Sequence, residues 1–324
     1  MKKALITGAM GFVGRRFARR LLDTGWRVTG IDNMVAGVHP KEWAFRAKSF
    51  DHFDAFYGDL RDYVKRKPTT GFDLIIHCAA VVGGRLVIDH DPLRVATDLA
   101  IDADLFQWLA KHQVKNQKVI YFSSSAVYPV WMQGSARLKM REGFVGFDSG
   151  KLDMPDESYG WAKLSGELLA RYAVKTYGLD VITYRPFSGY GEDQDFAYPF
   201  PSIVRRVVKR EDPITVWGSG KQTRDFIYIE DVIDAVLSTM YELKPGEALN
   251  LGSGVGTAFA DLAKWTYAVV HNEARAPNIR VDTTKPEGVF YRVADTEKLN
   301  LMWRPTTSLE EGIERVAKHL SCQK

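Results

Sequence analysis

The first half of the chain alternates short apolar runs with longer helical segments, and this alternation limits the fold more than any other feature. The apolar runs cover residues 4–7, 27–32, 72–80 and 118–128, and the helical segments lie near 12–24, 92–112 and 158–177. Runs that are apolar almost throughout are typical of parallel strands with helices on both faces. Strand–helix–strand units connect through right-handed crossovers. The sequence therefore predicts an α/β fold built on a doubly wound parallel sheet.

The second half differs in composition and predicts a smaller C-terminal lobe. Residues 186–224 are rich in glycine, proline and aromatic residues, with one helix near 202–210. Small strands and a final amphipathic helix from about Leu309 follow in the tail. We expect a first domain over 1–185, to which a strand–helix unit at 225–245 returns. Segments 186–224 and 246–324 would then form the smaller lobe.

Composition excludes several kinds of protein. No run of about 18 apolar residues is present, so no transmembrane helix is expected. The apolar run after the basic N-terminus ends at Thr7, which is too short for a secretory signal of roughly 7–15 apolar residues. The only two cysteines, Cys78 and Cys322, are far apart, which disfavours a disulfide framework. We expect a cytoplasmic protein with no membrane partner.

The net charge of +4 does not indicate a nucleic-acid binder, because such a protein needs a concentrated basic face. The densest basic cluster lies on the first helix, and we expect it to be a solvated helix face; its members are Arg15, Arg16, Arg19 and Arg20. Histidines and cysteines show no spacing typical of a metal site, so no metal is expected.

A glycine-rich turn joins the first strand to the first helix and predicts a dinucleotide site. In TGAMGFVG, Gly8 permits a tight turn, Gly11 allows the backbone to approach a pyrophosphate, and Gly14 allows close helix–sheet packing. The helix that starts near Phe12 and Val13 then offers N–H groups and a positive dipole end to the phosphates. Such a turn after the first strand of an α/β chain is typical of a Rossmann domain.

Acidic residues at two strand ends narrow the cofactor. Asp32 and Asn33 end the second strand, where a carboxylate can bind a ribose diol and would repel a 2′-phosphate. We therefore expect NAD rather than NADP. Asp59 and Leu60 follow the third strand and are candidates for the adenine edge, and Ala79 and Ala80, after His77 and Cys78, are candidates for the cofactor wall.

Three further residues form a candidate catalytic set. Tyr159 and Lys163 start a predicted helix and share one face of it at i, i+4 spacing. A tyrosine near its reference pKa of roughly 10 is a poor base, but a neighbouring ammonium favours its phenolate. Ser124, at the end of the preceding strand, can supply a hydroxyl to the same substrate oxygen.

The chain resembles the extended short-chain dehydrogenases, and in particular their NAD-dependent nucleotide-sugar epimerase/dehydratase family. The resemblance covers residue 1 to about residue 305 and rests on motifs in family order: TGAMGFVG, GDLRD, HCAA, SSSAVY, YGWAK, RPFSGYG and RDFIYIEDV. It implies a nucleotide-diphosphate sugar substrate held by the smaller lobe. The family's catalytic Ser/Thr, Tyr and Lys correspond to Ser124, Tyr159 and Lys163.

The same resemblance implies substrate contacts and an assembly. The diphosphate-binding arginine corresponds to Arg224, and a second one to Arg292. The loops that contact base and sugar correspond to 187–191, with Phe187 and Ser188, and to 216–218, with Trp217. Ser125 lies beside the catalytic serine and is a further substrate contact. The helices near 92–112 and 158–177 imply a homodimer that pairs through a four-helix bundle.

Departures from the family pattern narrow the reaction. The 4,6-dehydratases of the family carry Asp-Glu after the catalytic Thr, where this chain has Ser125 and Ala126. AAVVGG (79–84) and SSAVYP resemble GDP-mannose 3,5-epimerase and GDP-fucose synthase, which carry a catalytic Cys at the Ala126 position. No lysine lies in 186–208 to match the second acid of the 3,5-epimerase. Ser188 replaces the family's usual Asn.

What remains is hydride chemistry at one carbinol, most simply C4. We expect a nucleotide-sugar epimerase that acts by transient oxidation at C4. The alternative within the class is a nucleotide-sugar 4-dehydrogenase or 4-ketoreductase. The alternative from another class is a non-catalytic NAD-sensing or RNA-binding protein on the same fold, against which the intact Ser124–Tyr159–Lys163 set argues.

Overall fold

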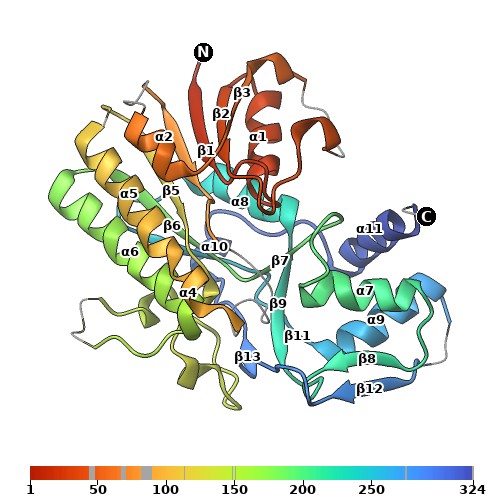
Figure 1. Cartoon of the computed structure of the whole chain (residues 1–324). Helices are drawn as coiled ribbons and strands as arrows, with labels where there is room; N and C mark the ends of the chain where they lie inside the picture. The colour runs from red at the N-terminus through yellow and green to blue at the C-terminus, as the bar shows by residue number, and fades with distance from the viewer. Residues whose placement is uncertain are drawn as a thin grey trace.

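A seven-stranded parallel sheet forms the frame of the larger lobe (Figure 1). The computed structural model describes residues 1–43, 48–66, 71–81, 90–112, 114–147, 149, 151–273 and 276–322. The strand order is β10-β6-β5-β4-β1-β2-β3, so the order reverses between β1 and β4, the crevice in which doubly wound folds bind their ligands. The strands are β1 (Lys3–Thr7), β2 (Arg27–Asp32), β3 (Phe53–Tyr57), β4 (Leu74–His77), β5 (Lys118–Phe122), β6 (Asp180–Pro186) and β10 (Ala248–Leu251).

Helices cover both faces of this sheet, which confirms the predicted doubly wound α/β fold. Successive residues of β1 point to opposite faces: Ala4 and Ile6 join one hydrophobic core and Leu5 the other. The first core lies under α1 (Gly14–Asp23) and α8 (Ile229–Thr239). The second lies under α2 (Leu60–Arg66), α5 (Thr97–His112) and α6 (Glu157–Tyr177). The helix expected near 92–112 is divided, because α4 (Pro92–Val95) precedes α5.

The smaller lobe contains two further sheets and three helices that lie at the lower right of Figure 1. Its strands are β7 (Ser188–Tyr190), β9 (Thr223–Tyr228), β11 (Gly256–Ala258) and β13 (Tyr291–Arg292) in one sheet, and β8 (Ile214–Trp217) and β12 (Ile279–Asp282) in the other. The helices are α7 (Pro199–Val208), α9 (Phe259–His271) and α11 (Leu309–Cys322). The short α10 (Glu297–Asn300) packs beside β10.

Two expected domain boundaries differ from the sheet topology. β10 pairs in parallel with β6 and is the edge strand of the large sheet, whereas we placed residues 246–324 in the smaller lobe. The strand expected to return to the first domain, β9, pairs instead with β7, β11 and β13. Only its helix, α8, returns and packs on α1. The division of the remaining residues stays a prediction.

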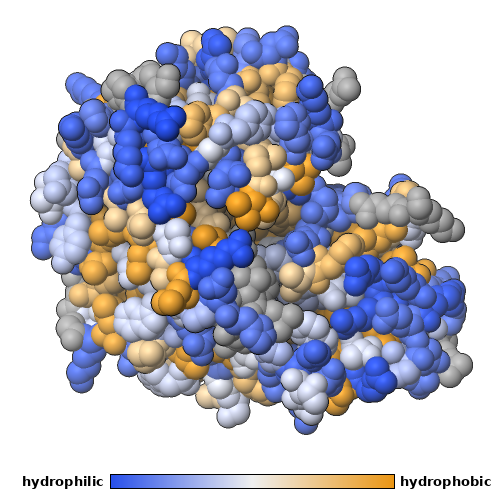
Figure 2. Space-filling view, in the orientation of Figure 1, coloured by the Kyte–Doolittle hydropathy of each residue, from blue (hydrophilic) through white to orange (hydrophobic). Residues whose placement is uncertain are grey.

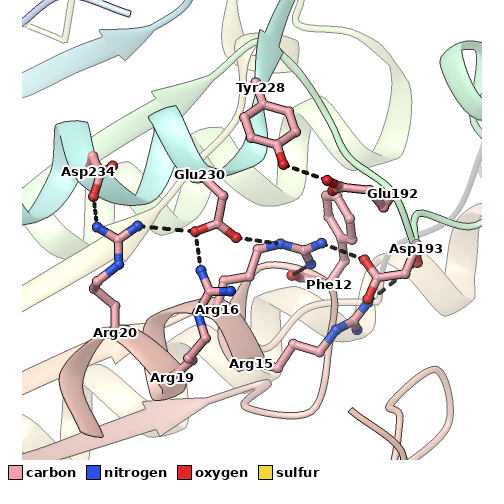
Figure 3. A network of polar contacts seen from close by, with 10 residues as sticks. All are labelled: Phe12, Arg15, Arg16, Arg19, Arg20, Glu192, Asp193, Tyr228, Glu230 and Asp234. Carbon is pink, nitrogen blue, oxygen red and sulfur yellow. Dashed lines mark hydrogen bonds and ion pairs between the residues drawn. The ribbon is translucent and has the colours of Figure 1, made fainter. Parts of the chain in front are cut away.

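The arginines of α1 do not form a solvated face, so that expectation is wrong. Arg15 and Arg16 are 2% and 4% exposed. The four guanidiniums bind three carboxylates (Figure 3): Arg15 and Arg16 bind Asp193, Arg16, Arg19 and Arg20 bind Glu230, and Arg20 also binds Asp234. Because Glu230 and Asp234 lie on α8, this network joins the first helix to α8 and to the loop after β7.

Within the described part of the chain, no helix has the length and apolarity needed to cross a membrane.

Candidate active site

The glycine-rich turn lies at the carboxyl end of β1, and its backbone leaves no room for side chains. Gly8 has φ +68°, and an added Cβ there would lie 2.8 Å from the amide nitrogen of Ala79. A Cβ at Gly14 would overlap the carbonyl oxygen of Gly8 and lie 2.9 Å from the Cα of Ala9. A Cβ at Gly11 meets only the Gly8 carbonyl oxygen, at 3.2 Å. The turn and the following helix start are therefore packed backbone on backbone, as the sequence predicted.

Phe12 and Val13 precede α1 and lie at the entrance of the turn. The Phe12 ring packs under the Arg16 guanidinium, whose Cζ is 4.2 Å from the ring centroid. Arg16 also donates to the Phe12 carbonyl oxygen at 2.7 Å, and Val13 is the N-cap of α1. Arg15 donates to the carbonyl oxygen of Met10 at 3.4 Å. The buried arginines of Figure 3 therefore hydrogen-bond to the backbone carbonyl groups of Met10 and Phe12 within the turn.

Asp32 ends β2 with its carboxylate directed at the glycine-rich turn. One oxygen accepts from the backbone N–H of Met10 at 2.9 Å, and the other accepts from the N–H of Met34 at 2.8 Å. The side chain is 8% exposed and stands at the edge where a ribose would meet the turn. Asn33 is exposed and its side chain accepts from the N–H of Val35 at 3.1 Å.

Asp59 begins the segment after β3, and Leu60, the first residue of α2, is buried. The Asp59 carboxylate accepts from Arg61 at 2.7 Å, and this hydrogen bond lowers the pKa of Asp59. After β4, the N–H of Ala79 donates to the Thr7 hydroxyl at 3.1 Å, and Ala80 is partly buried beside it. The four strand ends thus meet along one edge of the sheet.

These residues fit a dinucleotide such as NAD. Gly8, Gly11 and Gly14 form a turn in which a Cβ at Gly8 or Gly14 would clash with the backbone. The turn leads into a helix N-terminus, which is suited to binding phosphate. Asp32 stands one strand away with an acidic side chain, which suits an unphosphorylated ribose.

Ser124, Tyr159 and Lys163 come together where β5 ends against the start of α6. The Ser124 side chain accepts from the N–H of Ala126 at 3.1 Å. A Cβ added at Gly160 would lie 2.6 Å from the carbonyl oxygen of Ala126, so the segment after Ser124 packs against the turn of α6 that carries Tyr159. Lys163 is 3% exposed, and its Nζ lies 5.5 Å from the centroid of the Tyr121 ring. The structure therefore brings the three predicted residues into one cluster.

Opposing influences act on the Tyr159 hydroxyl. Burial has the largest effect and raises the pKa of Tyr159, while the Lys163 ammonium and the neighbouring Ser124 side chain lower it; the net pKa is raised. Asp98 and Asp102 add to the increase. The side chains around Tyr159 therefore favour its neutral phenol over the phenolate.

A buried ion pair between β6 and α6 also holds the end of β5 in place. Arg185 on β6 donates to both carboxylate oxygens of Glu167 on α6, at 2.8 and 2.7 Å, and both side chains are almost fully buried. Glu167 also accepts from the hydroxyl of Ser123 at 2.5 Å. Since Ser123 precedes Ser124, this pair fixes the end of β5 against the helix that carries Tyr159 and Lys163.

The two arginines predicted to bind diphosphate lie on neighbouring strands of the smaller lobe. Arg292 on β13 is the register partner of Arg224 on β9, so the two side chains leave the same face of the sheet. Arg292 binds Asp156 at 2.6 Å and Gln133 at 2.5 Å, and Arg224 donates to the carbonyl oxygen of Val289 at 2.8 Å. Their role in phosphate binding stays a prediction, which this shared face supports.

The remaining predicted substrate contacts occupy different depths. Phe187 is 7% exposed and packs on Tyr128, with ring centroids 6.1 Å apart, while Ser188 starts β7 and is partly buried. Ser125 is buried in the short helix after Ser124. Trp217 ends β8, and the Lys285 ammonium lies 5.7 Å from its ring centroid. Their contacts with a substrate stay predictions.

Sequence reasoning missed several polar residues around this cluster. Asp98 and Asp102 on α5 are completely buried and act on Lys163. Tyr198 is the N-cap residue of α7, and burial and then the negative charge of an ionised Tyr159 raise its pKa. No motif marks these positions; an i, i+4 pair of acids within an apolar helix was the available signal. The AAVVGG resemblance extends over residues 82–84, which lie outside the described residues.

Comparisons with known proteins agree with this arrangement. The profile of the NAD dependent epimerase/dehydratase family matches residues 4–252. A protein named GDP-L-fucose synthase from Sinorhizobium fredii is 30% identical over 97% of this chain and 94% of its own length. UDP-glucuronate 4-epimerase from Thermodesulfobacterium geofontis is 28% identical over 96% of this chain and 94% of its own length.

Solved structures share the fold. The crystal structure of UDP-glucose 4-epimerase from Thermotoga maritima, solved with UDP-glucose, superposes with a TM-score of 0.81 at 23% sequence identity. The match covers 99% of each chain. It extends through the large sheet and the smaller lobe alike.

Proposed function

The chain belongs to the NAD-dependent epimerase/dehydratase family, and on that premise we propose that it is a nucleotide-sugar epimerase that inverts C4 of the sugar through transient oxidation. The observation that carries the proposal is the packing of the segment after Ser124 against the turn of α6 that carries Tyr159, with Lys163 buried one turn further along the helix. The cluster stands at the carboxyl edge of the sheet, beside the glycine-rich turn.

The residues of the cluster have distinct tasks in this proposal. Tyr159 removes the proton of the C4 hydroxyl, and Ser124 orients that hydroxyl by hydrogen bonding. The buried ammonium of Lys163 stabilises the phenolate. When bound, NAD supplies the chemistry of accepting a hydride and returning it. Arg224 and Arg292 hold the diphosphate, so that the sugar can turn while the nucleotide stays in place.

The residues after Ser124 argue against elimination of water. Ser125 and Ala126 are 5% and 3% exposed and offer no carboxyl group to the substrate. A 4,6-dehydration needs an acid and a base beside the C5–C6 bond, and neither residue can serve. Inversion at C4 needs only the base, its activating ammonium and the cofactor.

A panel of UDP-, GDP- and dTDP-linked sugars incubated with the protein and NAD tests the proposal, with products identified by NMR. We expect one substrate to interconvert with its C4 epimer. Tyr159→Phe should lower turnover by about 10²–10⁴, the usual contribution of a general acid or base. Tyr177→Phe is the matched control, since Tyr177 ends the same helix but is 52% exposed. Equal turnover of Tyr159→Phe and wild type would reject Tyr159 as the base.

A single hydride transfer is the second candidate. The same Tyr159 and Lys163 would serve a nucleotide-sugar 4-dehydrogenase or 4-ketoreductase. Stoichiometric change of NADH with product distinguishes this reaction from epimerisation, which leaves the cofactor unchanged after each turnover.

We propose a homodimer formed through α5 and α6, which pack side by side on one face of the large sheet. Apolar and aromatic side chains remain exposed along this pair and on the adjoining α4: Leu93 by 84%, Leu99 by 40%, Trp161 by 40% and Tyr172 by 53%. Apolar residues also gather over these helices at the left of Figure 2. A cytoplasmic location, which we also propose, accords with the free thiols of Cys78 and Cys322.

A further inference from the structure

A line of buried hydrogen bonds connects Thr7, which precedes the glycine-rich turn, to Asp102, which packs against α6, the helix that carries Tyr159 and Lys163. The Thr7 hydroxyl lies 2.6 Å from His77 Nδ1, and His77 Nε2 lies 2.9 Å from Asp102 Oδ1. The other Asp102 oxygen accepts from the Tyr121 hydroxyl at 2.6 Å. All four side chains are at most 1% exposed.

The donors and acceptors along this line indicate that Asp102 is its charged member. Thr7 accepts from the N–H of Ala79 and can donate its own hydrogen to His77 Nδ1, the arrangement that lets His77 donate from Nε2 to Asp102 as a neutral ring. His77 then carries its hydrogen on Nε2 and donates to Asp102, as Tyr121 does. A carboxyl that accepts from two donors is stabilised as a carboxylate. Burial by itself raises the pKa of Asp102, but the hydrogen bond from His77 and the charge of Lys163 outweigh burial and lower it.

Asp102 lies directly against the helix that carries Lys163. Gly166 is three residues beyond Lys163 on α6, and a Cβ added there would overlap the Tyr121 hydroxyl and Asp102 Oδ2. The carboxylate therefore occupies the space that a side chain of α6 would take, on the turn next to Lys163. Burial lowers the pKa of Lys163, yet Asp102, Tyr159 and Asp98 together raise it above its usual value.

Asp98 is a second acid on the same side of the site. It precedes Asp102 by four residues on α5, so both side chains leave one face of that helix. One oxygen accepts from the N–H of Val81 at 2.5 Å, and among the described residues none donates to the other. Burial raises the pKa of Asp98, and the charge of Lys163 opposes this. The second oxygen of Asp98 is therefore a buried acceptor to which a donor such as an ammonium, a water or a ligand hydroxyl can bind.

We propose that Asp98 and Asp102 are positioning residues of the reaction: buried on α5 against the helix that carries Lys163, they act on the Lys163 ammonium, and their charges set how strongly that ammonium favours the Tyr159 phenolate. Asp102 packs against the turn of α6 next to Lys163 and is oriented by His77 and Tyr121. Asp98 lies one turn before Asp102 on α5 and is the second acid that acts on Lys163. The inference rests on the proposed function, in which Tyr159 is the base.

The proposal has a directional consequence for pH dependence. The groups of the described chain that act on Tyr159 and Lys163 are Asp98 and Asp102 from α5, Cys78 after β4, Tyr121 from β5, the Ser124 hydroxyl and Tyr198 from the cap of α7. Both carboxyls raise the pKa of Tyr159 and of Lys163. Neutralising either acid should therefore move both titrations to lower pH.

The test uses D98N and D102N, which keep the shape of the side chain and remove its charge. In the NAD-bound protein with ¹³C-labelled tyrosine, the Cζ resonance that disappears in Tyr159→Phe reports the ionisation of Tyr159 directly. We expect its midpoint to fall by about one pH unit in each variant, as is typical of losing a neighbouring charge. The bell-shaped pH profile of turnover should move to lower pH by a similar amount.

D98N is the safer variant for folding, because Asn keeps the acceptor for Val81 and replaces an oxygen to which no described residue donates. D231N is the matched control: Asp231 is 2% exposed on α8 and binds Thr306 and Thr307 away from the cluster. A merely structural role would lower the height of the profile and leave the Tyr159 midpoint in place. An unchanged or raised midpoint in folded D98N and D102N overturns the proposal.

The resonance measurement needs no sugar substrate, so the two proposals can fail separately. If the Tyr159 midpoint falls in both variants, the positioning role stands even when no nucleotide sugar is epimerised. If wild type epimerises a nucleotide sugar and the midpoint does not move, the epimerase proposal stands and the positioning role is rejected.

Discussion

The packing of Gly14 against Gly8 predicts that Gly14→Ala damages both the fold and the cofactor site. The added Cβ would overlap the Gly8 carbonyl oxygen and lie 2.8 Å from the carbonyl carbon and 2.9 Å from the Cα of Ala9. These atoms belong to the backbone, so no side chain can rotate away and the turn itself must move. Overpacking of this kind typically costs about 1–3 kcal/mol of unfolding free energy.

The same displacement should weaken NAD binding, because it shifts the N–H groups that face the pyrophosphate. Losing one hydrogen bond to a charged group costs about 1.5–3 kcal/mol, which corresponds to roughly 10–150-fold in Kd. Calorimetric titration with NAD measures the affinity, and urea denaturation of the free protein measures the unfolding free energy.

Two alanine variants separate these effects. Gly11→Ala meets only one atom, at 3.2 Å, so we expect it to lower the unfolding free energy by less than about 1 kcal/mol while it still weakens NAD binding. Gly143→Ala has nothing within 4 Å of the added Cβ and should change neither quantity. Wild-type affinity and stability in Gly14→Ala would refute the reasoning, and so would an effect of equal size in Gly143→Ala.

Three further predictions concern the cofactor, the core and the assembly. Because of Asp32, NAD should bind at least tenfold more tightly than NADP, about 1.4 kcal/mol, and equal affinities in calorimetry would count against this. Glu167→Gln leaves Arg185 without its buried counter-ion and should lower the unfolding free energy by about 3–5 kcal/mol in urea denaturation. Breaking the exposed pair of Glu311 and Arg315 should lower it by less than about 1 kcal/mol. Light scattering at micromolar concentration should give twice the chain mass of 36.6 kDa, and a mass near 36.6 kDa would contradict the dimer.

The elements of the large sheet could be predicted because their signals are local. The run at 27–32 coincides with β2, and the final helix begins at Leu309 as expected. β10 was assigned to the wrong lobe because the identity of its partner, β6, depends on tertiary packing and not on its own four residues. In the same way, the arginine-rich face of α1 looks solvated until the Asp193 loop and α8 cover it.

The residues of the candidate site also fall into two groups: those that local sequence patterns predict and those that depend on tertiary packing. Gly8, Asp32, Ser124, Tyr159 and Lys163 are marked in the sequence by short motifs or by a strand end, and the structure brings them to one edge of the sheet. The meaning of Asp98 and Asp102 depends on complete burial beside Lys163, and burial of an acid cannot be read from an amphipathic pattern. The shared face of Arg224 and Arg292 likewise depends on the register between β9 and β13.

The most direct test of the central claim follows a deuterium label at C4 of the nucleotide sugar that the panel identifies. The protein is incubated with this substrate and unlabelled NAD, and the product is analysed by NMR and mass spectrometry. If Tyr159 and Lys163 act in a transient oxidation at C4, the inverted product keeps the deuterium at C4 and no net NADH accumulates. Loss of the label to solvent would contradict hydride transfer at C4, and stoichiometric NADH formation would contradict epimerisation.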